Sequence, residues 1–160
     1  MRYQVKQKIF SLRDRFDIRD SNGNPVYTVE GKMLSLSDRF SFCDISGNEI
    51  YNCRKKVLAF LPEYYIFEGD IQIATLKKEF TFFRPKFHLE SKFGKYYMEG
   101  DFFSYNFEIR KGGLNIASIS KQFFSISDTY GIDISDSENQ AFILTIVIIL
   151  DFIFHNSSNS

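Results

Sequence analysis

An almost unbroken apolar segment near the carboxyl terminus places the strongest constraint on how this 160-residue chain can fold. Ala141 to Phe154 read AFILTIVIILDFIF, in which Thr145 and Asp151 interrupt the apolar side chains. The run is too long for one buried strand. The preceding SENQ has the pattern of a capping box, with Ser137 as the cap and Gln140 reaching back to it. We therefore predict a helix over about 137–155.

The composition of this segment predicts that the helix is buried on all sides. Ile, Val and Thr are mediocre helix formers, so contacts with the rest of the protein must stabilise the helix. A tail anchor in a membrane is the alternative, but a span needs about 20 apolar residues, and Asp151 would be costly in lipid. No Lys or Arg follows Lys121 to anchor a span. We expect a central helix inside the protein.

The first third of the chain contains an internal repeat. SLRDRFDIRDSNGNPVY, residues 11–27, matches SLSDRFSFCDISGNEIY, residues 35–51, without a gap. Asn22-Gly23 between two alternating segments is the strongest short-range signal for a β-hairpin with a two-residue type I′ turn. Ser46-Gly47 occupies the same place in the second copy. Each copy is therefore predicted to form a hairpin.

The same turns predict the pairing of side chains across each hairpin. In the first copy Phe16 lies opposite Val29 on an apolar face. In the second copy Cys43 lies opposite Ile50 and on the other face from Cys53. The sequence therefore predicts that the two cysteines are reduced and not bridged.

Further strands follow, and their number predicts a barrel. Turns are expected at Gly69-Asp70, near Phe93-Gly94 and at Gly112-Gly113, and short strands near Lys6–Leu12 and Met33–Leu36. The 19 Phe and 9 Tyr residues also favour strands. A sheet of about twelve strands can close around a helix, whereas eight strands are filled by their own side chains.

The expected fold is therefore mainly β, a closed antiparallel barrel of about twelve strands enclosing one C-terminal hydrophobic helix. We expect one domain over residues 1–155 and a polar, flexible tail over 156–160. The amino terminus has no apolar run of the kind that a secretory signal needs, which predicts a cytoplasmic protein.

Three segments of the chain resemble one known family. KQKIFSLRDRFDIRDSNGNPVYTVEGK, FTFFRPKF and ILTIVIILDFIFH are similar to the bacterial branch of the LURP-one-related proteins. The resemblance implies the fold of the tubby C-terminal domain, a twelve-stranded barrel around a central helix. Relatives with this fold include phosphoinositide-binding tubby proteins, phospholipid scramblases and plant defence proteins. Neither the basic pocket of the tubby domain nor the cysteine-rich segment of the scramblases is matched here, so the resemblance implies no site residues.

Local basic clusters are the candidate binding site. Lys plus Arg and Asp plus Glu both total 20, so the chain has no net charge to attract nucleic acid. The candidate residues are Arg54, Lys55, Lys56, Lys77, Lys78, Arg84 and Lys86, which together could bind an anionic ligand such as a phospholipid head group at a membrane surface. The alternative is a solvated outer face of the sheet. The aromatic residues of FTFFRPKF could also face a ligand, but we expect them in the core.

The sequence offers little support for catalysis. His88 and His155 are the two histidines, and His155 is expected at a frayed helix end. No catalytic or phosphate-binding motif is present, so we expect no catalytic residue, metal site or cofactor. Asp14 and Asp38 recur at equal places in the repeat, which favours a role in turns.

Asp20 and Asp44 precede the two turns, where an aspartate often caps the backbone. We therefore expect a non-catalytic binding or interaction module with a peripheral anionic membrane or another anionic ligand as its partner. Two alternatives remain, a small hydrolytic enzyme that uses carboxylates on the barrel rim and a tail-anchored membrane protein.

Overall fold

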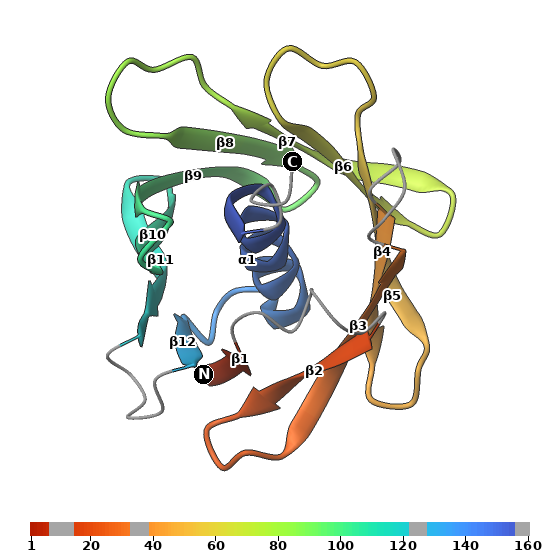
Figure 1. The fold of residues 1–160 in the computed structure, drawn as a ribbon. Coiled ribbons are helices and arrows are strands. Elements are labelled where there is room, and N and C mark those ends of the chain that lie inside the picture. The colour runs from red at the N-terminus through yellow and green to blue at the C-terminus, as the bar shows by residue number, and fades with distance from the viewer. Residues whose placement is uncertain (7–14, 33–38, 122–127, 156–160) are drawn as a thin grey trace.

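A computed structural model describes residues 1–6, 15–32, 39–121 and 128–155 of the chain. These segments form twelve strands and one helix (Figure 1). The strands are β1 Arg2–Lys6, β2 Arg15–Asp20, β3 Pro25–Lys32, β4 Arg39–Asp44, β5 Glu49–Lys55, β6 Glu63–Glu68, β7 Ile71–Lys78, β8 Lys86–Ser91, β9 Gly94–Asp101, β10 Asn106–Lys111, β11 Leu114–Ser120 and β12 Thr129–Ile134, and the helix is α1 Gln140–His155.

The strands form one closed antiparallel barrel. Each strand from β2 to β12 pairs with its neighbours in sequence, and β1 lies between β12 and β2 to close the circle. Tyr3 on β1 pairs with Ile132 on one side and with Asp20 on the other. The predicted barrel is confirmed. The expected strand at residues 33–36 and all but the first residue of the one at 6–12 lie outside the described residues.

Alternation along the strands directs every second side chain into the barrel. On β8, Phe87 and Leu89 are buried, whereas His88 between them is half-buried on the outer face. β1, β2, β5, β6, β9 and β10 alternate in the same way, whereas β4, β7, β11 and β12 contain consecutive buried residues. The buried apolar side chains of the strands form one hydrophobic core with the helix.

The first hairpin has the predicted strand register but not the predicted turn. A type I′ turn needs a positive φ at two residues, whereas here Gly23 (φ 86°) has one and Asn22 does not. The Gly23 amide donates to the Asp20 carbonyl at 3.1 Å, which makes a type I turn in a three-residue loop. A one-residue bulge after Ile18 compensates for the longer loop, so Phe16 still pairs with Val29.

The second hairpin repeats this geometry and corrects one predicted pair. A bulge between Phe42 and Cys43 places Cys43 opposite Glu49 instead of Ile50. Both cysteines are buried and free, as predicted, and Cys53 belongs to the hydrophobic core. Burial raises the pKa of both thiols.

The helix begins two residues later than its predicted cap implies. Asn139 Oδ1 accepts the Phe142 amide at 3.0 Å, so Asn139 is the N-cap and the prediction of Ser137 is wrong. The hydroxyl of Ser137 instead lies 3.0 Å from that of Ser135. Gln140 donates its side-chain amide to the carbonyls of Ser135 and Glu138, which leaves the capping box unformed.

The helix lies inside the barrel, as predicted, with strands on every side (Figure 1). Thirteen of its 16 residues are buried. Thr145 donates its hydroxyl to the Ala141 carbonyl at 2.8 Å, so it remains hydrogen-bonded without leaving the core. Within the described residues, no helix has the length and hydropathy required to cross a membrane, and the tail-anchor alternative finds no support here.

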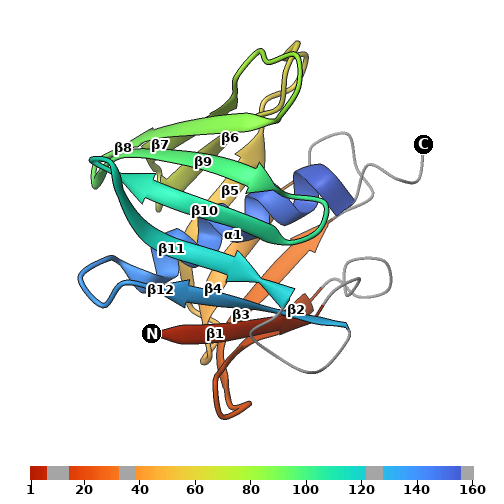
Figure 2. The same ribbon diagram turned by 90° about the vertical axis from the view of Figure 1, so that its left-hand side faces the viewer.

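The two ends of the barrel differ in how they connect the strands. At one end, here called the turn end, β2–β3, β4–β5, β6–β7, β8–β9 and β10–β11 are joined by tight turns. At the other, here called the loop end, residues 56–62, 79–85 and 102–105 form longer loops. The loops at 56–62 and 79–85 project side by side in both views (Figures 1 and 2). The last turn of α1 reaches the loop end, where His155 contacts the Phe102 carbonyl.

Replacing Ile146 with Asp should abolish the fold. Ile146 is fully buried midway along α1, and an unpaired carboxylate there would cost several kcal/mol. This is comparable with the total stability of a domain, about 5–15 kcal/mol. Circular dichroism and thermal denaturation should show an unfolded or insoluble protein.

The matched control is Ile146→Val, which removes one methylene group and should cost only about 0.5–1.5 kcal/mol while keeping a cooperative transition. Ending the chain at Asp136 should also prevent folding, because the empty barrel has no core. A cooperative transition with native strand content in that truncated chain would show that the barrel does not depend on the helix.

Candidate functional site

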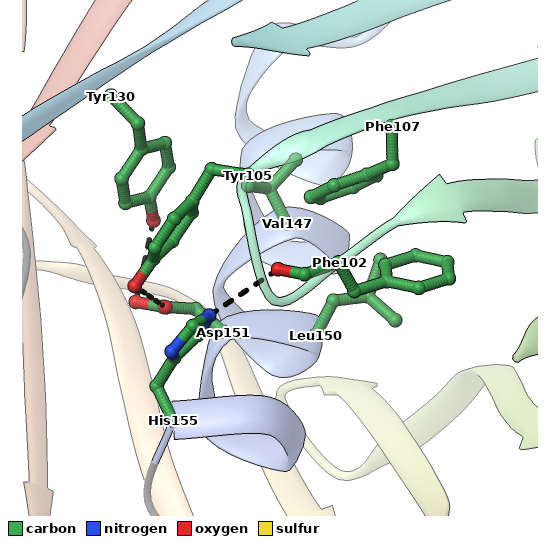
Figure 3. Close-up of a pocket in the computed structure, with 8 residues that line it drawn as sticks. All are labelled: Phe102, Tyr105, Phe107, Tyr130, Val147, Leu150, Asp151 and His155. Atoms are coloured by element: carbon green, nitrogen blue, oxygen red, sulfur yellow. Dashed lines mark hydrogen bonds between the residues drawn. The ribbon is translucent and has the colours of Figure 1, made fainter. Parts of the chain in front are cut away.

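A buried carboxylate near the loop end is the most unusual polar group in the core. Asp151 on α1 is only 4% exposed. The Tyr105 hydroxyl donates to its Oδ1 at 2.8 Å, and the Tyr130 hydroxyl donates to its Oδ2 at 3.3 Å. Figure 3 shows the two tyrosines converging on Asp151 from the barrel wall. Both carboxylate oxygens therefore have hydrogen-bond donors.

Aromatic stacking holds this cluster together. The ring of Tyr105, in the loop at 102–105, stacks on Tyr130 of β12 and on His155 of α1, each at 4.3 Å between centroids. Tyr105 has a positive φ of 51°, which non-glycine residues seldom adopt. The His155 Nε2 lies 3.3 Å from the Phe102 carbonyl. The prediction of a frayed end at His155 is therefore wrong, because the ring is packed against the wall.

Burial controls the electrostatics of the cluster. Desolvation raises the pKa of Asp151 to about 7, although the hydrogen bonds from Tyr105 and Tyr130 lower it in part. Desolvation also raises the pKa of both tyrosines and lowers that of His155. Asp151 therefore keeps its proton to a higher pH than an exposed aspartate does.

The space around Asp151 is too small for a substrate. Eight residues line the hollow drawn in Figure 3, and the space between them has no room for a water-sized molecule. The cluster thus serves to hold the end of α1 and the loop at 102–105 against the wall. The spacing of Asp151 and His155, four residues apart on one helix face, was the signal in the sequence that could have indicated such a pair.

The predicted basic residues are partly brought together. Lys56 Nζ lies 3.3 Å from Oε2 of Glu63, and Lys77 Nζ lies 4.0 Å from Oε1 of the same carboxylate. The hydrogen bond to Glu63 raises the pKa of Lys56. The Lys78 amide donates to the Pro62 carbonyl at 3.1 Å, which ties the end of β7 to the loop at 56–62. Lys56, just after β5, and Lys77 on β7 thus meet on one carboxylate of β6, which lies between those strands.

The remaining predicted residues extend this group along the loop end. Arg84 is exposed in the loop at 79–85, and Lys86 begins β8 with its Nζ 3.9 Å from Oε2 of Glu99. Arg54 lies farther down the wall, where its guanidinium covers the Phe67 ring at 4.4 Å. These three residues come from β5, from the loop at 79–85 and from β8, and β6 and β7 separate β5 from β8. Binding of a ligand to them remains a prediction.

The prediction that the FTFFRPKF aromatics belong to the core is wrong for three of the four phenylalanines. Phe80, Phe82 and Phe83 are exposed in the loop at 79–85, and Phe87 on β8 is buried. The alternating pattern was correct for β8, but the preceding residues do not continue the strand.

Asp20 and Asp44 are engaged in the turns of the two hairpins. Asp20 Oδ1 accepts the amides of Asn22 and Asn24, each at 2.9 Å, and Asp44 accepts the Asn48 amide at 2.9 Å. Their predicted role in the turns is confirmed. Asp14 and Asp38 lie outside the described residues. The described residues contain no group of three or more His, Cys, Asp or Glu side chains arranged to hold a metal ion.

Three comparisons with known proteins agree with this architecture. A family model described as LURP-one-related matches residues 1–151. The uncharacterized protein YxjI of Bacillus subtilis strain 168 is 30% identical over 155 residues, which cover 97% of this chain and 94% of that protein. An Arabidopsis thaliana protein solved by X-ray crystallography matches with a TM-score of 0.70 over 95% of this chain and 90% of its own, at 17% identity. That last similarity shows a shared fold alone.

Replacing Asp151 with Asn should change how stability depends on pH. Because the pKa of Asp151 is raised in the folded state, protonation stabilises the fold fully below about pH 4, and this stabilisation is lost as pH rises through about 7. The free energy of unfolding of Asp151→Asn, relative to that of the original chain, should therefore increase as pH rises from about 4 to about 7, by up to about 1.4 kcal/mol per pH unit. Denaturant unfolding of both proteins from pH 5 to pH 8 measures it.

The control is Asp133→Asn, which neutralises a half-exposed carboxylate on β12 that pairs with Arg2. Its stability difference should be nearly flat over the same pH range, because this side chain is about half exposed on the outer face and is not enclosed by the core. An equally flat difference for Asp151→Asn would contradict a raised pKa at this site.

Proposed function

The chain belongs to the LURP-one-related family, and from that premise we propose that it is a non-catalytic module that binds anionic ligands, with phospholipid head groups as the first candidates. The cationic side chains at the loop end form the binding surface. The observation that carries this proposal is the meeting of Lys56 and Lys77 on Glu63, which brings two lysine pairs from distant parts of the sequence together.

The carboxylate of Glu63, which Lys56 and Lys77 share, is a counter-ion that an anionic ligand could replace. Glu63 offsets part of the repulsion between the two lysines while the site is empty, since like charges placed close together destabilise a fold. The lysine side chains remain about half exposed, so a phosphate group can approach them without the cost of burying an unpaired charge. Arg84 and Lys86 extend the positive surface beyond this pair.

A second observation argues against the shallow depression on the outer face of β11 and β12 as the site. Asp133 and Asp136 line it, and they pair with Arg2 and with the amino terminus. Both carboxylates already engage the neighbouring cations, so those cations are not available to an anionic ligand.

Neither alternative function gains a specific observation. The buried carboxylate of Asp151 has no space for a substrate beside it, and the described rim carboxylates Asp20 and Asp44 are engaged in turns. The apolar helix lies inside the barrel, which leaves it no lipid-facing surface to act as an anchor.

Reversing two charges at the loop end should weaken binding to anionic vesicles. The variant Lys55→Glu/Lys78→Glu keeps the Lys56 and Lys77 contacts with Glu63. Because each lysine near an anionic surface contributes about 1 kcal/mol, we expect binding at least about tenfold weaker. Binding by the original chain should also fall as salt rises. Co-sedimentation with vesicles of phosphatidylcholine and phosphatidylglycerol measures both effects.

The matched control is Lys92→Glu/Lys95→Glu, which changes the net charge equally at the turn end. It should bind like the original chain. Equal loss in both variants would show that net charge alone is responsible and would contradict a site at the loop end. Competition by soluble inositol phosphates tests whether a free anion is also a ligand.

A further inference from the structure

Exposed apolar side chains gather on the three described loops of the loop end. The five exposed phenylalanines among the described residues all lie there, together with two aliphatic side chains. The group consists of Val57, Leu58, Phe60, Phe80, Phe82, Phe83 and Phe103. We name these residues the apolar tips.

The apolar tips are held outward. Leu58, Phe83 and Phe60 are 99%, 97% and 92% exposed. Leu58 has a positive φ of 62°, an unfavourable conformation that a folded chain keeps only when the surroundings enforce it. Phe80 and Phe82 contact each other edge-on at 5.4 Å between centroids, so they are arranged as a pair before anything binds.

The turn end provides the comparison within the same molecule. Met1, Ile45, Ile71 and Leu114 are its large exposed hydrophobic residues among those described, and none of them is aromatic. Its connections are short turns in which Asp20 and Asp44 bind the backbone. The loop end thus carries seven large exposed apolar side chains, five of them aromatic, against four at the turn end. Several such side chains gathered at one end of a molecule mark an interaction site, whereas single ones are ordinary.

Positive charge surrounds the bases of the same loops. The segments 55–63, 77–86 and 101–105 contain six Lys and Arg residues against three Asp and Glu residues, in a chain with no net charge. Apolar side chains at the tips with cations behind them complement an anionic bilayer, in which the acyl region lies beneath a layer of phosphates. The loops at 56–62 and 79–85 project as two separate loops (Figure 1), a shape suited to entering lipid between head groups.

We propose that the loop end docks on an anionic lipid bilayer, with the phenylalanines of the loops at 56–62 and 79–85 inserted among the lipids. This inference rests on the proposed function, since the cations at the bases of the loops contact the head groups. It adds a second component of binding, which is apolar and therefore resists salt.

Tryptophan at position 82 provides a direct test, because the chain contains no tryptophan. With vesicles of phosphatidylcholine and phosphatidylglycerol, the fluorescence of Phe82→Trp should shift to the blue and be quenched by lipids brominated on the acyl chain. Ile71→Trp, at the exposed start of β7 on the turn end, is the control and should show neither change. No shift for Phe82→Trp on vesicles that bind the protein would overturn insertion and leave the proposed function standing.

Removing the apolar tips separates the two components of binding. Phe82→Ser/Phe83→Ser should keep the thermal stability of the original chain, because both side chains are exposed. Its vesicle affinity should fall by about tenfold or more for each phenylalanine removed, and the remaining binding should disappear at high salt. Ile71→Ser/Leu114→Ser should bind normally.

Three further results would contradict membrane insertion, the proposed function or both. Unchanged affinity in Phe82→Ser/Phe83→Ser would overturn the inference. Binding of soluble inositol phosphates without any binding to vesicles would overturn it while supporting the proposed function. If the original chain binds neither, both proposals fail.

Discussion

Mutual burial of α1 and the inner face of the barrel is the interaction on which the rest of the structure depends. A twelve-stranded barrel is too wide to be filled by its own side chains, and a helix rich in Ile and Val has little intrinsic stability. Each therefore supplies the apolar surface that the other needs. Ile146, midway along the helix, lies in the centre of that contact, and Phe142 near the start of the helix packs against Tyr51 and Tyr96; both Ile146 and Phe142 are fully buried. The closed sheet, its turns and the polar contacts at the two ends of the helix surround this apolar contact.

Polar contacts at both ends of α1 determine how the helix sits in the barrel, because hydrophobic contact alone has no direction. At the turn end, the Tyr96 hydroxyl donates to Glu138 at 3.0 Å, and Lys111 Nζ donates to the same carboxylate at 3.1 Å. At the loop end, Asp151 accepts from Tyr105, which holds the loop at 102–105 in place. Contacts with the core therefore hold the loop at 102–105, one of the three described loops of the loop end.

The sequence by itself determined the fold class and most of the strand register. The apolar run at 141–154 predicted a helix buried on all sides, and the alternating segments separated by glycine turns predicted the strands around it. Phe16 pairs with Val29 as predicted, because burial of one face leaves only one acceptable register. The turn type could not be predicted from Asn22-Gly23, since a bulge compensates for a longer loop without moving the buried side chains.

Only the tertiary structure decided which residues meet and which face solvent. Lys56 and Lys77 converge on Glu63 because β5 and β7 flank β6, a relation that sequence distance does not contain. The pattern of FTFFRPKF marks aromatic residues, but exposure depends on where β8 begins, and Phe83 lies before that point. Asp151 gains its raised pKa from burial beside two tyrosines of distant segments. Local periodicity encodes the elements of this protein, whereas its surfaces and its buried charge arise from contacts between residues far apart in the chain.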